Sequence, residues 1–451
     1  MVNVQEVIPS AKRLIKSLRD IGYDFSTAVA DLVDNSIEAG ATRIDILVEF
    51  DGDNSFVRIS DNGKGMTVDE LKEAMRYGSE RTYNEEDLGK FGLGLKTASM
   101  SQCQCFHVAS RTMEEINFIP AFCWDLAHIE KTNKWEIIEP KSKEILTLLR
   151  EPLNEHKGTV VLWQKVDRML GFKHPYGEPA RKKLISMCRE LEGYLAMVFH
   201  KFLAHETSRE PLEIYLNFNK IEPWDPFARD EPETKELSSL SVKLSHEGVK
   251  GKILLKPYIL PTKEGFSSPD KFKRASGPAN WNQQQGFYIY RADRMIQSGG
   301  WCGIRTRDEH TKLSRIELNF SPMFDNAFKI NVAKMRVQLP IQIKDTIDQA
   351  IGVAVRLARE HYDGKKKSSF KQSVHPTYAA QPSETDKKES GSDSDKSASS
   401  KSFSTSYGIE TPKFSLDEIE EKAINISTEQ EKPIIKQVFQ RLRKDLFGKD
   451  K

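Results

Sequence analysis

The apolar residues of the first sixty positions change from a helical to a strand period. Between Ser10 and Ala39 they recur at helical spacing on both sides of a Gly-Tyr-Asp break, which predicts two helices, the second ending at Gly40. Residues 43–50 and 55–60 then alternate between apolar and polar side chains around a polar turn. This alternation predicts a β-hairpin directly after the second helix.

The rest of the first 170 residues predicts further strands mixed with helices. Thr67 opens a short helix over 67–76, and residues 78–92 have the polar, glycine-containing composition of a mobile lid. Because consecutive strands follow one another without βαβ alternation, we expect an α+β fold in which a sheet packs against helices. The expected strands cover 103–111, 116–125, 135–139 and 158–163.

Three further regions follow the first domain, which we place at 1–170. A second domain at 171–363 begins with a long amphipathic helix over 178–204. Residues 364–412 contain few large apolar side chains and cannot repay the entropy of ordering, so we expect a disordered linker. Residues 413–451 predict a helical segment, broken at Pro433, that either pairs with another subunit or packs on its own domain. The second domain is expected to have strands around 214–218, 252–255, 286–290 and 316–320, and a closing helix from Gln342.

Composition limits the class of protein. A chain of 451 residues with a net charge of +2 can form two or three domains, and DNA binding would need a local basic patch. The five cysteines lack a CxxC spacing, so neither a disulfide framework nor a zinc site is indicated. Cys103 and Cys105 are interpreted as small buried residues of a strand. Without a signal peptide or a long apolar run, we expect a soluble, cytoplasmic protein that does not bind membranes.

Three short motifs carry the candidate chemistry, and all lie within the first hundred residues. The first places Asp31 and Asn35 one turn apart on a predicted helix. The second has a carboxylate, Asp61, followed by two glycines, and the third is a glycine-rich loop that enters a helix and can bind phosphate oxygens. The motifs read Asp31-Leu-Val-Asp-Asn-Ser-Ile-Glu-Ala-Gly-Ala41, Asp61-Asn-Gly-Lys-Gly-Met66 and Phe91-Gly-Leu-Gly-Leu-Lys96.

In this order the motifs resemble those of the GHKL ATPases, the superfamily of DNA gyrase B, Hsp90, histidine kinases and MutL. Within it the chain is most similar to prokaryotic MORC and MutL-like proteins, over roughly its first three quarters. The resemblance implies a Bergerat-type α/β sandwich that binds ATP and Mg²⁺. It also implies that the second domain is an S5-like transducer, which contacts the nucleotide from the far side.

The resemblance assigns the first motif to the metal and the attacking water. Asn35 holds Mg²⁺, which prefers hard oxygen ligands, and Asp31 activates the water. Family members usually carry glutamate at that position, so the shorter Asp31 predicts slow hydrolysis. Asp34 points to another face of the helix and is a weaker candidate. The alternative is that Asp31 and Asn35 are ordinary solvated helix residues.

The other motifs are assigned to the base and the phosphates. Asp61 accepts a hydrogen bond from the adenine amine, while the glycines after it let the backbone approach the base. Thr159 matches a strand threonine that contacts adenine through water, although threonine is ordinary in strands. The remaining expected contacts are Gly63, Gly65 and Met66 around adenine, and Gly89, Gly92, Gly94 and Lys96 around the phosphates.

The second domain supplies one more candidate and a set of basic residues. Residues 331–340 are similar to the MutL segment whose lysine reaches the γ-phosphate, which indicates Lys334 as a catalytic residue and Lys329 as the second choice, against a plain solvated lysine. Basic residues around Trp301 and at 181–183 could form a groove for DNA phosphates or a salt-bridged surface. Those around Trp301 are Arg291, Arg294, Arg305, Arg307, Lys312 and Arg315.

Three functions share such a nucleotide pocket. The first is an ATPase that forms a homodimer on ATP binding and clamps DNA or a protein partner. By resemblance to prokaryotic MORC-like proteins, a partner nuclease or other defence protein is implied. The second, a histidine kinase, is not expected, because it needs a phosphoacceptor helix before the motifs and these begin near residue 31. The third is a non-hydrolysing scaffold or an Hsp90-like chaperone module.

Overall fold

The computed structural model describes residues 9–20, 22–78, 94–114, 118–171, 173–278, 280–330 and 337–371, together with the single positions Ile424, Lys432, Lys436 and Phe439. The chain divides into two compact units, 1–376 and 377–451, and the architecture below is that of the first unit. Gly89, Gly92 and Lys334 lie outside the described residues. The predicted linker beyond residue 371 lies outside them as well, as does the predicted C-terminal helix apart from those single positions.

Within the described residues, the first sheet has seven strands in the order β4-β3-β5-β2-β1-β6-β7. The predicted hairpin is present, since β1 and β2 pair antiparallel and Ile44 lies opposite Asp61. All other neighbours in this sheet are antiparallel except β1 and β6. The strands are β1 (Arg43–Glu49), β2 (Phe56–Asp61), β3 (Cys105–Arg111), β4 (Ala121–Asp125), β5 (Gly158–Gln164), β6 (Glu213–Leu216) and β7 (Asn219–Lys220).

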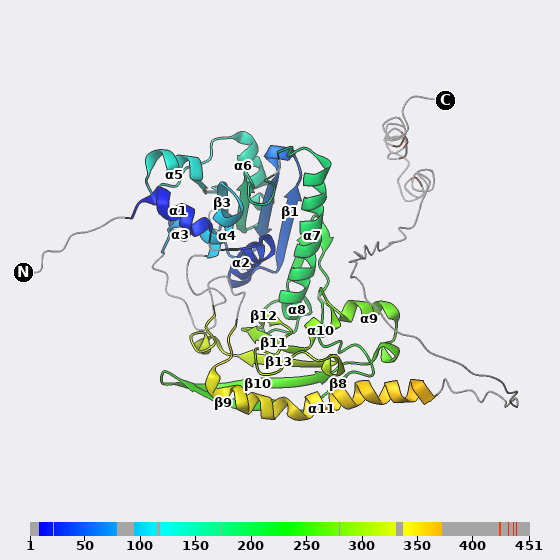
Figure 1. Cartoon of the computed structure of the whole chain (residues 1–451). Coiled ribbons are helices and arrows are strands. Elements are labelled where there is room, and N and C mark those ends of the chain that lie inside the picture. The colour runs from blue at the N-terminus through cyan, green and yellow to red at the C-terminus, as the bar shows by residue number, and fades with distance from the viewer. Residues whose placement is uncertain are drawn as a thin grey trace, which may run out of the picture. The chain divides into compact units, whose positions relative to one another are not determined.

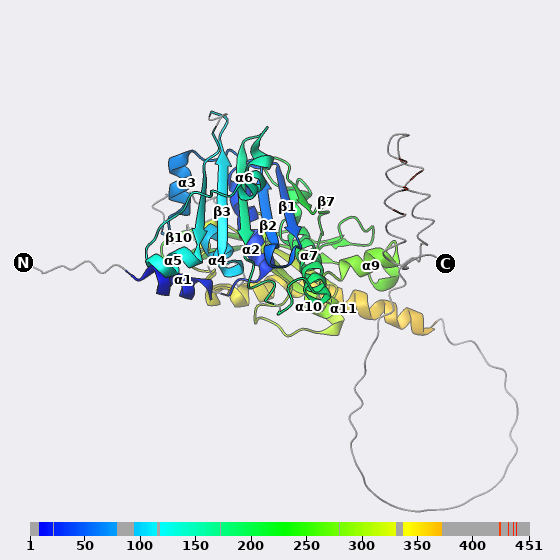
Figure 2. The same cartoon turned by 90° about the horizontal axis from the view of Figure 1, so that it is seen from above.

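Alternating side chains divide the first sheet into two covered faces. On β5, Val161 and Trp163 belong to a large core with α1, α2 and α4, whereas Val160 and Leu162 pack in a separate core with α6. Figure 2 shows β1 beside β2 in this layer, with β3 farther along the same sheet. The helices of this part are α1 (Ala11–Arg19), α2 (Phe25–Glu38), α3 (Val68–Met75), α4 (Gly94–Gln102), α5 (Leu126–Thr132), α6 (Lys143–Arg150) and α7 (Glu178–Val198), with 3₁₀ turns at Gly52–Asn54 and Glu151–Leu153.

The second sheet has its own core and lies against the longest helix of the described residues. Its strand order is β12-β11-β13-β10-β8, with β9 added to β10, and α11 (Ile341–Lys371) runs along it (Figure 1). Ile347 and Ile351 of α11 pack with Ile253 and Leu255 of β10. The strands are β8 (Lys235–Glu236), β9 (Leu240–His246), β10 (Val249–Ile259), β11 (Gly286–Arg291), β12 (Arg294–Ser298) and β13 (Ser314–Phe320). The helices are α8 (His200–Leu203), α9 (Pro269–Ala275) and α10 (Trp281–Gln284), with 3₁₀ turns at Lys263–Gly265, Glu309–Thr311 and Pro322–Phe324.

Helix α7 joins the two sheets, because it contacts both α2 of the first part and β12 of the second (Figure 1). It is amphipathic, with Leu184, Leu191 and Leu195 buried along one side. Its N-terminal Pro179 has no N–H to leave unpaired and is therefore suited to the first turn. The position of α7 therefore sets the distance between β12 and α2. Both of these elements contribute residues to the site described below.

The predicted α+β fold, with a first domain in which a sheet packs against helices, is confirmed. Several details differ from the expectation. Strands β6 and β7 lie beyond residue 170 yet complete the first sheet. Residues 135–139 form only an isolated bridge, between Ile138 and Cys123. Helix α11 continues to Lys371, past the predicted start of the linker at 364, because local composition did not reveal where the helix ends. None of the helices in the described part has the length and apolarity to cross a membrane.

Candidate functional site

Helix α2 carries the first motif and begins at a strong cap. The side chain of Asp24 accepts a hydrogen bond from the Thr27 N–H at 2.8 Å, which satisfies one of the free donors of the first turn. Asp31 and Asn35 follow one turn apart, as predicted, but their surroundings differ. Asp31 is 3% exposed, whereas Asn35 is exposed to solvent. The amide oxygen of Asn35 is therefore accessible to a metal ion, and the Asp31 carboxylate is inside.

Two residues close to the first sheet, Tyr23 and Gly94, lie against the Asp31 carboxylate. The Tyr23 hydroxyl donates to Oδ2 at 2.6 Å. Burial, and then the charge of Asp31, raises the pKa of Tyr23 well above its usual value, so the phenol stays protonated and remains a donor. A Cβ atom on Gly94, the first residue of α4, would lie 3.5 Å from Asp31 Oδ2. The start of α4 thus lies beside this carboxylate.

Arg294 of β12 reaches α2 from the second sheet. Its Nε donates to Asp34 Oδ1 at 2.8 Å, and its Nη2 lies 3.9 Å from Asp31 Oδ1. Burial lowers the pKa of Arg294, but Asp34 and other neighbours, including Asp31, outweigh it and raise that pKa above its usual value. Arg294 and Asp34 are each 1% exposed. Asp34, the weaker sequence candidate, therefore lies in a buried ion pair that joins the two sheets.

The second motif places Asp61 at the end of β2, where Ser36, the Gly63 backbone and the Thr159 backbone all interact with its carboxylate. Ser36 Oγ of α2 donates to Oδ2 at 2.9 Å, and the Gly63 N–H donates to Oδ1 at 2.9 Å. Burial raises the pKa of Asp61, opposed by these hydrogen bonds. A carboxylate has about four lone-pair positions, so Asp61 keeps acceptor capacity for a further donor such as an adenine amine.

The glycines that follow Asp61 are required by close backbone packing. Gly65 has φ +74°, and a Cβ atom there would lie 2.0 Å from the Arg111 carbonyl oxygen. A Cβ on Gly63 would lie 2.7 Å from Ala39 Cβ and 2.9 Å from Asp61 Oδ1. Any side chain at these positions would push the turn away from β3 and α2.

Ser110 of β3 organises this side of the site, although sequence reasoning did not single it out. The Met66 N–H donates to Ser110 Oγ at 2.8 Å, and Ser110 Oγ donates to the Gly158 carbonyl at 2.9 Å. Ser110 Oγ also lies 2.9 Å from Thr159 Oγ1. Thr159 in turn lies opposite Asp61 in the β2–β5 register. The sheet therefore brings Asp61, Met66 and Thr159 together, as expected, through a serine that carries no motif in the sequence.

Lys96 was expected to contact phosphate, but its amine contacts a backbone carbonyl of the protein. It is 3% exposed, and its Nζ donates to the Ala74 carbonyl of α3 at 3.0 Å. Burial lowers the pKa of Lys96 to about 8. The reason is the helix register, since Lys96 follows the start of α4 by two residues and its side chain is directed toward α3. Of the expected phosphate contacts from the glycine-rich loop, only Gly94 and Lys96 are described.

Half of the basic residues around Trp301 are internal, so they belong neither to a groove for DNA phosphates nor to a salt-bridged surface. Arg291 is buried in an ion pair with Asp325 at 2.8 Å, Arg315 donates to the carbonyls of Pro226 and Ala275, and Arg294 pairs as described above. Trp301 is itself buried. Arg291, Arg294 and Arg315 lie in β11, β12 and β13, whereas Arg305 and Arg307 lie outside the strands. The sequence analysis did not separate these two groups, because the partners that bury the first group are distant in the chain. Arg307 and residues 181–183 are exposed, and Lys329 is exposed at the end of the described segment.

The site residues fit a nucleotide with a divalent cation. Mg²⁺ keeps several waters and takes few protein ligands, which suits a single accessible oxygen such as that of Asn35. Nη1 and Nη2 of Arg294 are buried and make no hydrogen bond within the described residues, so they are donors that an anionic ligand can satisfy. Asp61 keeps room for an amine donor, and the glycines permit close approach of the backbone.

Comparison with known proteins places this site in a family. Residues 23–159 match the histidine kinase-, DNA gyrase B- and HSP90-like ATPase family, so this segment is similar to GHKL domains. The match begins at the tyrosine that contacts Asp31 and ends at Thr159, so it spans the first and second motifs and the strands that hold them.

The chain is also similar to several MutL proteins. The chain is 38% identical over 95 residues to the DNA mismatch repair protein MutL of Shewanella sp. (strain MR-4), which covers 20% of this chain and 15% of that protein. It is 43% identical over 72 residues to MutL of Azorhizobium caulinodans, which covers 16% and 11%, and 39% identical over 95 residues to MutL of Aliivibrio fischeri, which covers 20% and 14%. The chain thus spans a small part of these relatives' length. The family and the MutL similarity together support ATP binding and nucleotide-driven switching in general.

Proposed function

We propose that this chain is a slow, Mg²⁺-dependent ATPase in which nucleotide occupancy changes the arrangement of the first and second sheets. The observation that carries the proposal is the reach of Arg294 from β12 to Asp34 and Asp31 on α2. A residue of the second sheet thereby contacts the same helix that carries the expected metal ligand and water-activating carboxylate. A change at the nucleotide has a direct route to the second sheet.

The residues of the site divide the work as follows. Asp61 and the backbone of Gly63 and Gly65 bind the base, with Thr159 beside them. Asn35 holds Mg²⁺, whose positive charge neutralises phosphate oxygens. Asp31 takes a proton from the attacking water. A lysine from the second domain, Lys334 or Lys329, contacts the terminal phosphate and stabilises the charge that develops on it.

The contacts of Asp31 support slow turnover. Oδ2 accepts the Tyr23 hydroxyl at 2.6 Å, and Oδ1 faces the Arg294 guanidinium. The Tyr23 hydrogen bond occupies one lone pair of the carboxylate and leaves fewer positions from which Asp31 can take a proton from water. Because Arg294 comes from the second sheet, a movement of Arg294 would couple hydrolysis to the position of that sheet.

Three aspartate variants test the assignment. Asp61→Asn should lose binding of an ATP analogue in calorimetry, because an amide presents one acceptor oxygen and repels the adenine amine with its NH₂. Asp31→Asn should bind the analogue normally and lose hydrolysis. Asp45→Asn, a surface carboxylate paired with Arg43, is the control and should change neither. Equal ATPase activity in Asp31→Asn and the parent chain would refute the role of Asp31.

Dimerisation and partners form the remaining part of the proposal. We infer that ATP binding brings two copies together and that the closed dimer holds DNA or a protein partner, including a nuclease or another defence protein. The support is the similarity to proteins named for DNA mismatch repair. Light scattering with and without a non-hydrolysable ATP analogue should show a doubled mass only with the analogue. A constant monomer mass in both conditions would contradict this part.

A non-hydrolysing scaffold or Hsp90-like chaperone module is the second candidate, and the constrained position of Asp31 favours it. The same variants decide between the two functions. If the parent chain binds the ATP analogue through Asp61 but releases no phosphate above the Asp31→Asn background, the scaffold is the correct description.

A further inference from the structure

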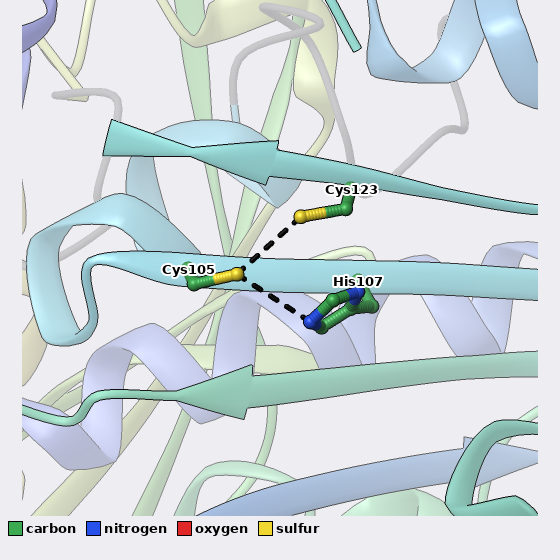
Figure 3. Close-up of side chains that lie close together, drawn as sticks. All are labelled: Cys105, His107 and Cys123. Carbon is green, nitrogen blue, oxygen red and sulfur yellow. Dashed lines mark hydrogen bonds between the residues drawn. The ribbon is translucent and has the colours of Figure 1, made fainter. Parts of the chain in front are cut away.

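A second cluster of chemically capable side chains lies on the face of the first sheet that α6 covers. Cys105 and His107 are alternate residues of β3, so they point to the same face as Ala109, which packs in the α6 core. Cys123 of β4 lies directly opposite His107 in the register and shares that face. Figure 3 shows the three side chains pointing toward one another. The nucleotide site does not use any of them.

The ligand atoms of this cluster are close enough for one metal ion. The Cys105 Sγ lies 3.3 Å from the Cys123 Sγ and 3.4 Å from the His107 Nε2. All three atoms lie within 4.8 Å of one another. Zn²⁺ binds thiolate sulfur at about 2.3 Å and imidazole nitrogen at about 2.0 Å, so two sulfurs on one tetrahedral ion lie about 3.8 Å apart. Binding requires the sulfurs to separate by about half an ångström.

The surroundings suit a closed, structural ion. Cys105, His107 and Cys123 are all buried, at 3 to 5% exposure. Gln164 of β5 lies opposite Cys105 in the register, and its Oε1 is 2.8 Å from His107 Nε2, so this oxygen lies beside the cluster. Gln164 is half-buried, so either its oxygen or a water molecule bound to it can complete a tetrahedron.

We propose that Cys105, His107 and Cys123 bind a structural Zn²⁺ that ties β3 to β4, with Gln164 at the fourth position. The ligands alternate along one strand and come from two strands, which explains why the sequence lacks the CxxC spacing of zinc motifs. The ion would hold one end of β3, the strand that also carries Ser110 of the nucleotide site.

Metal content is the first measurement. The full chain, without a histidine tag, should be purified in reducing buffer and its metals measured by mass spectrometry. We expect about one equivalent of zinc per chain. Cys105→Ser and Cys123→Ser should each lower this at least about tenfold, since a hydroxyl is a poor zinc ligand. Cys103→Ser is the matched control, because Cys103 is equally buried, donates to the Ser99 carbonyl and is absent from the cluster.

A second measurement on the unaltered chain keeps the test independent of variant folding. Replacement of zinc by Co²⁺ should give the sulfur-to-metal absorption bands of a tetrahedral thiolate site. Removal of metal by a chelator should lower the thermal midpoint, and zinc should restore it. Absence of stoichiometric metal after incubation with zinc would overturn the proposal. So would full zinc content in Cys105→Ser, or a Cys105–Cys123 disulfide as the sole state of the freshly purified chain. Because the readouts do not involve ATP, they are separate from the test of the ATPase.

Discussion

The Arg294–Asp34 ion pair gives the sharpest quantitative prediction, because it is buried and links the two sheets. The perturbation is Arg294→Met, which keeps much of the side-chain length and removes the charge. The guanidinium is within 2.8 Å of Asp34 Oδ1 and 3.9 Å of Asp31 Oδ1, and both aspartates are at most 3% exposed. The single substitution therefore leaves two buried carboxylates without this cation.

The size of the effect follows from that burial. Breaking a buried pair by removing one partner costs about 3–5 kcal/mol, because the remaining charge is desolvated without compensation. Replacing both partners by apolar residues is often neutral or stabilising. We therefore expect Arg294→Met to lower the free energy of unfolding by about 4 kcal/mol. The double variant Arg294→Met with Asp34→Leu should recover most of that loss, leaving only the charge of Asp31 unbalanced.

The assay is urea unfolding of the parent chain, both single variants and the double variant, followed by tryptophan fluorescence. The coupling energy from the double-mutant cycle should exceed about 2 kcal/mol, because the double variant recovers most of the loss at Arg294→Met and Asp34→Leu has a cost of its own. Substitution of a surface pair, Arg43→Met with Asp45→Leu, provides the control and should couple by less than about 1 kcal/mol. Equal coupling in the buried and surface cycles, or additive single effects at the buried pair, would refute the reasoning.

Three further predictions concern single side chains of the site. The pKa of Lys96 lies at about 8, below its usual 10.5, so the folded state loses this proton before the unfolded state does. Stability should therefore rise by about 3 kcal/mol as pH increases from about 8 to 10.5, relative to Lys96→Met, and parallel denaturation profiles of the two chains across that window would contradict this. Gly158→Ala should cost at least about 3 kcal/mol in thermal unfolding, because Gly158 has φ +145° and a Cβ would lie 1.8 Å from the Asp61 carbonyl oxygen. Gly248→Ala, with φ +85° but open space, should cost only about 1 kcal/mol, and a similar loss at both glycines would show that the close contact is not responsible. Ser110→Ala should destabilise by about 2 kcal/mol and weaken ATP-analogue binding in calorimetry, because the Met66 N–H and the Gly158 carbonyl lose their partner; unchanged affinity would show that this serine does not organise the base site.

The local elements could largely be predicted from the sequence. The helical spacing of α2 and the alternation of β1 and β2 are properties of short segments, and short segments of regular structure obey the two periods of side-chain direction. The composition of the Asp31, Asp61 and Gly94 motifs likewise indicated a nucleotide-binding domain, which the family match confirms. A serine in a strand and an arginine in a hairpin carry no such local pattern.

By itself, therefore, the sequence determined the α+β class, the hairpin before Asp61 and the type of ligand that the first domain is expected to bind. The tertiary structure decided which charges are inside. Strand β12 places Arg294 against Asp34 from 260 positions away, and the pairing of β3 with β4 brings Cys105 to Cys123. These contacts depend on the packing of α7 and on strand register, which arise from long-range burial and not from the spacing of neighbouring residues. A pairwise contact between distant segments has no periodic signal in a single chain, so only the folded structure reveals it.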